Sequence, residues 1–172
     1  SSQEVFPTHA LFGFPLSDTG ADGLIRWLVE PGVGKEAPRA AAYLNAHTVN
    51  RGLRRGSNLG ELFQQFDLLY PDGMSVVREA RRRGCYVSER VSAADFFPRF
   101  CWAAAAKERT LAVVGGAEGI AVACADAMKE RVAGLRVVYT HHGYLPEGSP
   151  ERTQVVRNLR EMRPDITLLG MG

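Results

Sequence analysis

Short apolar runs alternate with longer segments of helical periodicity along the whole chain, and this order constrains the fold more than any other feature. Parallel strands need helical crossovers, so such an alternation predicts a mostly parallel sheet with helices on both faces. We therefore expect an α/β fold, a Rossmann-like three-layer sandwich. The expected strands cover residues 10–14, 41–44, 67–70, 111–114, 135–139 and 165–169.

The helices are expected between these strands, where apolar residues recur every three or four positions. Residues 111–114 are continuously apolar, which is typical of a strand buried on both faces. Ser149 and Pro150 have the form of an N-cap followed by proline at the first helical position. The Gly/Pro-rich stretch from Pro31 to Pro38 is expected to be a surface connection. Helices are expected over residues 18–30, 74–83 and 92 to about 107. Two more are expected, one from the glycine turn at 115–119 to about 131 and one from 150 onward.

Composition limits the classes of protein to which the chain belongs. With 172 residues and 45% hydrophobic content, it can bury one substantial core, so a single domain over residues 1–172 is expected. A net charge of +2 is too small for a typical nucleic-acid-binding protein. Cys85, Cys101 and Cys124 lack C-x-x-C spacing, which argues against a disulfide framework or a zinc site and favours a reducing, cytosolic compartment.

A carboxylate follows the apolar run of residues 68–70 directly. Asp72 lies between Pro71, which fixes its own φ, and Gly73, which tolerates unusual φ values. Ligands of open α/β sheets bind at the carboxyl ends of the strands, where this side chain is expected. Asp72 is therefore a candidate general base, although ordinary turn chemistry is the alternative interpretation.

Two further loops follow expected strands. Gly115, Gly116 and Gly119 lie between a strand and a helix, where backbone N–H groups and the helix dipole favour a diphosphate. The spacing differs from the dinucleotide fingerprint and no acidic residue follows at the required distance, so NAD binding is disfavoured. A tight turn without a ligand is the alternative.

The second loop contains His141, His142, Gly143 and Tyr144. Neighbouring residues of a strand point to opposite faces, so we expect the two histidines not to share a metal ion. No carboxylate pattern completes a metal site there. The Gly-Tyr pair is instead expected to lay an aromatic face against a base or a sugar.

Several motifs occur together in a recognisable order: Asn45 after a strand, 70–74 (YPDGM), 89–95 (ERVSAAD), 114–116 (VGG), 142–144 (HGY), and 164–166 followed by 169–172 (PDI, LGMG). In this order the chain resembles the WecG/TagA/CpsF glycosyltransferases, glycosyltransferase family 26. The resemblance covers nearly the whole chain from Leu11 onward.

The resemblance implies transfer of a sugar from a UDP-sugar, of N-acetylmannosamine or glucose type, to a polyprenyl-diphosphate-linked acceptor during cell-surface polysaccharide synthesis. It implies inversion and no required metal or cofactor. Asp72 matches the catalytic base, Asn45 an active-site polar residue and Arg90 a residue near the leaving diphosphate. Substrate-binding positions by the same matching are Tyr43, Gly73, Asp95, Gly115, Gly116, His142, Gly143, Tyr144 and Gly170.

The chain departs from the family pattern at three places. Tyr43 stands where many members have Thr, and Ala93 where many have Gly. The family continues past the final Gly-x-Gly with a Pro-x-Gln-Glu motif and a C-terminal region, which are absent from this sequence. A catalytically weak UDP-sugar-binding or scaffold module is therefore the alternative function, and an NAD(P)-dependent oxidoreductase is a more distant one.

The implied partners follow from the same resemblance. The acceptor lipid lies in a membrane, and the sequence has no run of about 18 apolar residues that would span one. We therefore expect a cytoplasmic protein with peripheral contact at the inner face of the cell membrane. Binding of nucleic acid is not expected, and a homo-oligomer is left open.

Overall fold

The structure is a computed structural model that describes residues 6–31 and 38–171. Residues 32–37 of the expected surface connection, and Gly172 of the last glycine motif, lie outside the described residues. The chain divides into two compact units, the first ending at Phe97 and the second beginning at Pro98. This boundary falls inside helix α5 (Ala93–Ala106). The single domain expected from composition stays a prediction.

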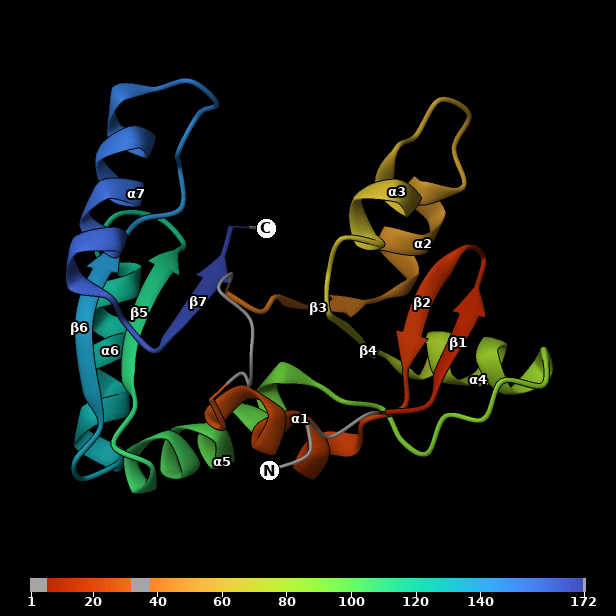
Figure 1. Ribbon diagram of the computed structural model, residues 1–172, viewed down its shortest axis with the longest axis horizontal. Helices are drawn as coiled ribbons and strands as arrows, with labels where there is room; N and C mark the ends of the chain where they lie inside the picture. The colour runs from red at the N-terminus through yellow and green to blue at the C-terminus, as the bar shows by residue number, and fades with distance from the viewer. Residues whose placement is uncertain (1–5, 32–37, 172) are drawn as a thin grey trace. The chain divides into compact units, whose positions relative to one another are not determined.

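The described residues of the first unit form a hairpin, two parallel strands and four complete helices, as can be followed in Figure 1. Its elements are β1 (Thr8–Leu11), β2 (Phe14–Ser17), α1 (Gly20–Val29), β3 (Ala41–Leu44), α2 (Ala46–Gly52), α3 (Leu59–Phe63), β4 (Leu68–Pro71) and α4 (Met74–Arg82).

The single strand expected over residues 10–14 is wrong. The chain instead reverses between β1 and β2, which pair antiparallel with Leu11 opposite Phe14. Phe12 and Gly13 form the turn with φ values of 51° and 85°. Two consecutive positive φ values are typical of a tight two-residue hairpin turn whose twist matches that of the strands. Glycine inside the apolar run was the signal of this turn.

Strands β3 and β4 pair in parallel, from Ala41 opposite Leu68 to Leu44 opposite Pro71. Asp67 fixes the start of this pairing with two hydrogen bonds to one residue. Its N–H donates to the carbonyl oxygen of Ala40 at 2.9 Å, and its Oδ2 accepts from the N–H of Ala40, also at 2.9 Å. The carboxyl ends of the two strands are consequently level.

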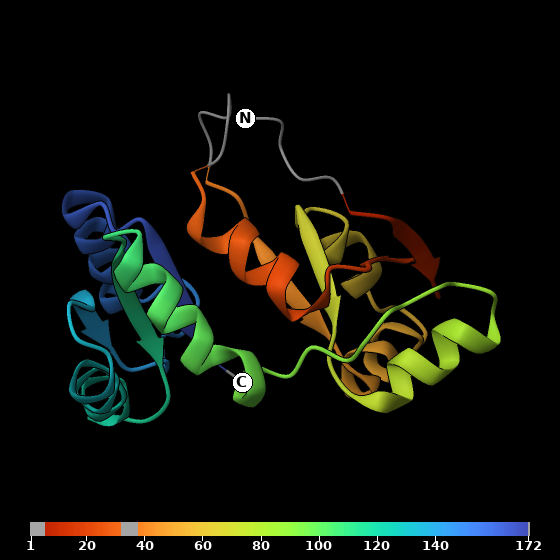
Figure 2. The same ribbon diagram turned by 90° about the horizontal axis from the view of Figure 1, so that it is seen from below.

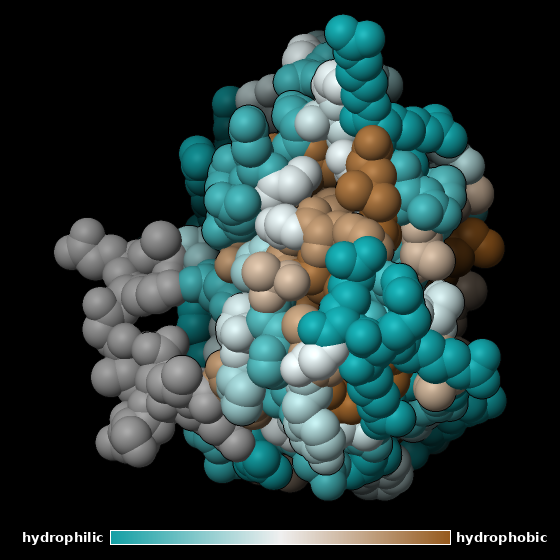
Figure 3. Space-filling model, turned by 90° about the vertical axis from the view of Figure 1, so that its right-hand side faces the viewer, coloured by the Kyte–Doolittle hydropathy of each residue, from teal (hydrophilic) through white to brown (hydrophobic). Residues whose placement is uncertain are grey.

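A buried cluster that includes Phe14, Leu44, Leu69 and Val77 forms the core of this unit. Helix α4 buries Val76, Val77 and Ala80, while the arginines at 81–83 are exposed. Figure 3 shows the side of the molecule that lies to the right in Figure 1, where a strip of apolar residues interrupts a mostly hydrophilic surface.

The second unit contains a three-stranded parallel sheet in the order β6-β5-β7. The central strand is buried along most of its length, as its continuous apolar sequence predicts. The crossover from β5 to β6 and that from β6 to β7 run in opposite directions along the sheet. Right-handed connections then place α6 and α7 on opposite faces (Figures 1 and 2). The elements are β5 (Thr110–Gly115), α6 (Ile120–Arg131), β6 (Arg136–His141), α7 (Pro150–Met162) and β7 (Ile166–Gly170).

The structure confirms the mixed α/β class with parallel sheets that the alternating pattern predicted. Ser149 caps α7 as expected, because its Oγ accepts a hydrogen bond from the N–H of Arg152 at 3.2 Å. Strand β6 extends two residues further than expected, to His141. Among the helices of the described residues, none has the length and apolar character needed to cross a bilayer.

Candidate active site

Asn45 and Asp72 lie next to one another at the carboxyl edge of the β3–β4 pair. They directly follow Leu44 and Pro71, which are opposite each other in the parallel register. The N–H of Asp72 donates to the carbonyl oxygen of Leu44 at 2.9 Å and so continues the ladder by one step. The structure therefore brings together the two polar residues that the sequence placed after separate strands.

Asn45 is the N-cap of α2. Its Oδ1 accepts hydrogen bonds from the backbone N–H of Thr48 at 2.9 Å and from the Thr48 hydroxyl at 3.1 Å. A capping side chain is held in one orientation by these bonds. The Nδ2 amino group is the part of Asn45 that remains to donate a hydrogen bond to a ligand.

The carboxylate of Asp72 is half-buried, and within the described part of the chain it makes no hydrogen bond or ion pair. Gly73, with a φ of 96°, turns the backbone from β4 into α4 directly after it. Two residues before Asp72 is Tyr70, whose ring packs edge-on against that of Phe96, with 5.9 Å between the centroids. It also contacts the ring of Tyr43 at a tilt, with 6.4 Å between the centroids.

Tyr70 is itself a poor proton acceptor. Burial raises the pKa of its phenol to about 12, and the negative charges of Asp72 and Tyr43 add to this effect. The phenol therefore stays protonated at neutral pH. Of these two side chains at the end of β4, the carboxylate of Asp72 is the one that can act as a general base.

Arg90 lies in a segment that is anchored on both sides. Before it, Ser88 binds the carboxylate of Asp18 through its N–H (2.8 Å) and its hydroxyl (2.6 Å). After it, the N–H of Val91 donates to the carbonyl oxygen of Pro71 at 2.8 Å. Arg90 thus precedes a residue, Val91, that is bonded to the last residue of β4, and its backbone is fixed close to Asp72.

Glu89 supplies the third anchor, which the sequence interpretation did not identify. Its Oε1 accepts a hydrogen bond from the N–H of Ala21 at 2.7 Å, in the first turn of α1. Helix N-termini have unpaired N–H groups, and an acidic side chain from elsewhere in the chain satisfies one of them here. The 68-residue separation of Glu89 and Ala21 hides this contact from any local pattern.

Arg90 and Asp95, both predicted as site residues, form an ion pair of 2.6 Å. Their side chains are 43% and 64% exposed. Exposed pairs contribute only about 0–1 kcal/mol, so an anionic ligand that offers more hydrogen bonds can displace Asp95 from the guanidinium. Tyr43 also belongs to this edge and is 44% exposed.

In the second unit, four glycines of the predicted site pack backbone against backbone. The N–H of Gly116 donates to the carbonyl oxygen of Gly170 at 3.0 Å, and that of Gly143 donates to the carbonyl oxygen of Gly116 at 2.8 Å. A Cβ on Gly115 would lie 2.5 Å from the oxygen of Gly170, and one on Gly143 would lie 3.0 Å from the Cα of Gly115. Close approach of three strand ends therefore explains why Gly115 and Gly143 are glycine.

The Gly115–Gly119 loop does lead into the N-terminus of a helix, α6, as expected. Gly119 is its N-cap with a φ of 81°, and no side chain caps the helix. The side chain of Ile120 covers Gly116, where an added Cβ would lie 2.7 Å from its Cγ2. Diphosphate binding at this loop stays a prediction.

Tyr144 lies just beyond this glycine contact and is 72% exposed. Its N–H donates to Nδ1 of His142 at 3.3 Å, while Nε2 of His142 lies 3.0 Å from Oε1 of Glu151. His142 thus joins the Tyr144 loop to the first turn of α7. The exposed ring is free to lie against a flat ligand.

The expectation that His141 and His142 point to opposite faces is wrong. Strand β6 ends at His141, so the alternation of a strand does not extend to His142, and the two ring centroids are 4.3 Å apart. Both rings approach Glu151, the nearer nitrogens lying 3.8 Å and 3.0 Å from its Oε1. Glu151 was missed because it follows an eight-residue loop and belongs to the next helix.

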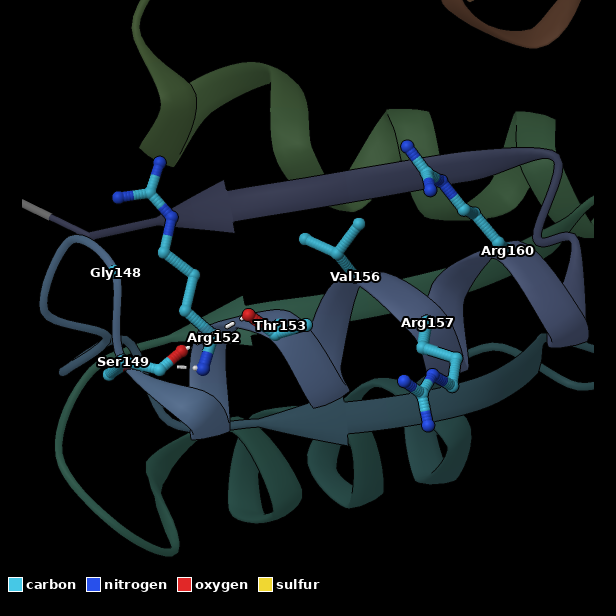
Figure 4. Close-up of a pocket in the computed structure, with 7 residues that line it drawn as sticks. All are labelled: Gly148, Ser149, Arg152, Thr153, Val156, Arg157 and Arg160. Carbon is cyan, nitrogen blue, oxygen red and sulfur yellow. Dashed lines mark hydrogen bonds between the residues drawn. The ribbon is translucent and has the colours of Figure 1, made fainter.

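A shallow hollow of about 390 Å³ lies along α7 (Figure 4). Arg152, Val156 and Arg160 point to one side of the helix and Arg157 to the other. The hollow has positive charge, but its polar groups come from one helix and its lining contains none of the predicted site residues. It is lined by Gly148, Ser149, Arg152, Thr153, Val156, Arg157 and Arg160.

Comparison with known families assigns the chain to one of them. No curated protein matches the sequence at a significant level. The family described as "Glycosyl transferase WecG/TagA/CpsF family" matches residues 9–172. This match includes both strand edges described above and nearly the whole sequence, and it confirms the resemblance seen in the ordered motifs. The chain therefore belongs to the WecG/TagA/CpsF family of glycosyl transferases.

Proposed function

We propose that this protein transfers a sugar from a UDP-sugar to a polyprenyl-diphosphate-linked saccharide, with inversion at the anomeric carbon and Asp72 as the base. The family match supports the general part of this proposal, a glycosyltransferase for cell-surface polysaccharide. The observation that carries the transfer mechanism is the half-buried carboxylate of Asp72, which has no partner among the described residues and lies beside Asn45 at the level ends of two parallel strands.

In the proposed step, Asp72 accepts the proton of the acceptor hydroxyl as its oxygen attacks the anomeric carbon of the donor. The new bond forms on the face opposite the UDP, the bond between the anomeric carbon and the UDP oxygen breaks, and UDP leaves with the electron pair. A positioned base accelerates such a step by roughly 10²–10⁴-fold. The step requires no redox cofactor, and we propose that it requires no metal.

The departing diphosphate needs a cationic partner. Arg90 suits this role because its backbone is anchored on both sides while its side chain makes an exposed ion pair with Asp95. A guanidinium can donate two parallel hydrogen bonds to phosphate oxygens. Asp95 would then keep the guanidinium oriented until the nucleotide displaces it.

The other predicted residues have binding roles in this proposal. Nδ2 of Asn45 and the exposed ring of Tyr43 contact sugar groups, and Gly73 sets the angle of Asp72. In the second unit, Tyr144 offers an exposed aromatic face for a base or a sugar. The loop at Gly115, Gly116, Gly143 and Gly170 offers its backbone, and His142 holds the Tyr144 loop.

We also propose that the protein works at the cytoplasmic face of the cell membrane. The lipid-linked acceptor would be anchored there, so the enzyme would reach it by peripheral contact. Donor identity, N-acetylmannosamine or glucose type, is best decided by a mass-spectrometric screen of UDP-sugars with a short-chain prenyl-diphosphate acceptor.

The decisive variant is Asp72→Asn, which keeps the size of the side chain and removes its basicity. We expect transfer to fall by about 10²–10⁴-fold while the Kd for UDP, from calorimetry, changes by less than about twofold, because a base need not touch the nucleotide. Glu61→Gln, an exposed carboxylate on α3, is the matched control and should leave both values unchanged.

Two results would count against the proposal in different ways. Retention of more than about a tenth of the transfer rate in Asp72→Asn would remove Asp72 as the base. Binding of UDP by the unaltered chain with no transfer from any UDP-sugar would instead favour the alternative function, a UDP-sugar-binding module.

A further inference from the structure

We propose that His141, His142 and Glu151 form a binding site for a divalent transition-metal ion such as Zn²⁺. The site belongs entirely to the second unit, where the end of β6 meets the start of α7. Its evidence is independent of the proposed transfer reaction and of Asp72.

The spacing of the donor atoms suits a small tetrahedral ion. Zinc binds histidine nitrogen and carboxylate oxygen at about 2.0–2.2 Å, which places neighbouring donors about 3.3–3.5 Å apart in a tetrahedron. Oε1 of Glu151 lies 3.0 Å from Nε2 of His142 and 3.8 Å from Nε2 of His141. One donor atom from each of the three residues lies within 4.8 Å of the others. The two distances to Glu151 thus differ from the tetrahedral spacing by only a few tenths of an ångström.

His141 is already oriented as a ligand. Its Nδ1 lies 3.0 Å from the carbonyl oxygen of His142, a contact in which the nitrogen must be the donor. Nδ1 therefore carries a proton, and in the neutral ring the lone pair lies on Nε2, the nitrogen that faces Glu151. Such a backbone bond on the second ring nitrogen is the usual support of a metal-binding histidine. The ring also stacks on Tyr139, with 6.3 Å between centroids and 16° between planes.

His142 has the opposite arrangement. Its Nδ1 accepts from the N–H of Tyr144, so Nε2 carries the proton that Glu151 accepts. A metal ion on Nε2 would displace this proton, and the neutral ring would then carry its proton on Nδ1. The 3.3 Å bond from Tyr144 would be lost. Binding of the ion should therefore change the backbone environment of Tyr144.

The three side chains are accessible to an ion from solvent. Those of His141 and His142 are 23% and 22% exposed, and that of Glu151 is 48% exposed. Glu151 lies in the first turn of a helix whose N-terminus is capped by Ser149, so its backbone is fixed relative to the loop. Three protein ligands leave one tetrahedral position for water or for an anionic oxygen.

The test is calorimetric titration of the whole chain with Zn²⁺ alone. We expect one site in the unaltered protein and affinity at least about tenfold weaker in His141→Ala and in Glu151→Gln. The glutamine keeps an acceptor for His142 but removes the charge, so its loss of affinity reports ligation rather than loop folding. His47→Ala removes an exposed histidine of α2 in the first unit and should bind Zn²⁺ as the unaltered protein does.

Two spectroscopic measurements complete the test. The visible spectrum with Co²⁺ should lack a thiolate charge-transfer band, since Cys85, Cys101 and Cys124 take no part, and the backbone NMR signal of Tyr144 should shift with Zn²⁺. A thiolate band, an unshifted Tyr144 signal, or equal Zn²⁺ affinity in all variants would each overturn the proposal. Circular dichroism of each variant confirms that the fold is intact.

Discussion

The two strand edges that hold the predicted site residues are built differently. At the end of β3 and β4, the residues contribute side chains: a cap from Asn45, a half-buried carboxylate from Asp72, and a guanidinium on an anchored segment from Arg90. At the end of β5, β6 and β7, the glycines contribute backbone, and three strand ends approach within hydrogen-bonding distance. Isosteric replacements at the first edge should therefore leave the fold intact but reduce ligand binding or transfer. Replacements at the second edge should first reduce the stability of the fold.

Gly115→Ala is the strongest test of this contrast. The new Cβ would lie 2.5 Å from the carbonyl oxygen of Gly170, and neither backbone can move without breaking the bond between Gly116 and Gly170. Overpacking of this kind costs typically about 1–3 kcal/mol. We expect a loss of about 3 kcal/mol in the free energy of unfolding, measured with urea.

Gly60→Ala is the matched control for that variant. Gly60 lies in α3 with a negative φ, and an added Cβ would meet no atom within 4 Å. Because alanine favours helix over glycine by about 1 kcal/mol, the control should be neutral or more stable. Equal destabilisation by both variants would show that the glycine contact at the second edge is not the cause.

Arg90→Lys tests whether the first edge acts through side-chain chemistry. The lysine keeps the charge but cannot form the two parallel bonds of a guanidinium. We expect UDP to bind about tenfold more weakly, with an unchanged midpoint of thermal unfolding. Asp95→Asn should bind UDP as well as the unaltered protein or better, because it removes the competing carboxylate from Arg90. Weaker binding by Asp95→Asn would contradict the displacement that we propose.

Glu89→Ala would sharpen the comparison, since it changes the support of the first edge without touching the site side chains. The variant leaves the N–H of Ala21 without its acceptor, and loss of a helix cap costs about 1 kcal/mol. We expect a loss of stability of that size in urea unfolding. Glu61→Gln serves again as the control, and an effect no larger than its own would refute the capping role.

The smallest expected effect concerns pH. The backbone N–H of Thr110 donates to Asp165 and lowers the pKa of that carboxyl below its ordinary value of 3.8. Burial opposes this effect, while the Thr110 hydroxyl and Arg109 also lower the pKa. A carboxyl whose pKa is lower in the folded state stabilises the fold at pH values above its unfolded-state pKa. This contribution is lost as the pH falls through the folded-state pKa. Asp165→Asn should thus flatten the dependence of stability on pH below about 4.

For this prediction, urea unfolding at a series of pH values from 7 to 2.5 is the measurement. Asp126→Asn, which removes an exposed i,i+3 partner of Lys129, is the control. A pH profile of Asp165→Asn that matches that of the unaltered protein would show that other carboxyls account for the acid sensitivity.

Local sequence patterns predicted most of the elements because their signals are local. The apolar run of β5, the cap of α7 and the turn after β4 all came from adjacent residues. The hairpin at Phe12 and Gly13 was missed because apolar character continues through the turn. Long-range contacts could not be predicted in this way: those of Glu89 with Ala21 and of His142 with Glu151 depend on packing of elements that are separate in sequence.

The candidate site shows the same limit. Placement of Asn45 and Asp72 after strands was predicted, and parallel pairing then put them side by side. The pairing of Arg90 with Asp95 was not predicted, although both were named, since a motif gives the identity of residues but not their partners. The glycines were interpreted as a phosphate loop, whereas the structure gives them a packing role that any ligand-binding role would have to share.

Asp67 and Asp165 lie at the amino ends of strands, opposite the candidate site, and they limit the changes in strand length that the site can tolerate. Asp67 joins the start of β4 to Ala40, and Asp165 joins the start of β7 to Thr110, so each sheet is aligned from its amino end. Strands β3 and β4 are both four residues long, and this equal length brings Asn45 and Asp72 level at the far end. Inserting one residue into β4 would carry Asp72 about 3.3 Å further and turn it to the other face. Deletions and insertions in these strands should therefore be more damaging than substitutions, and variation in length should be confined to the loops.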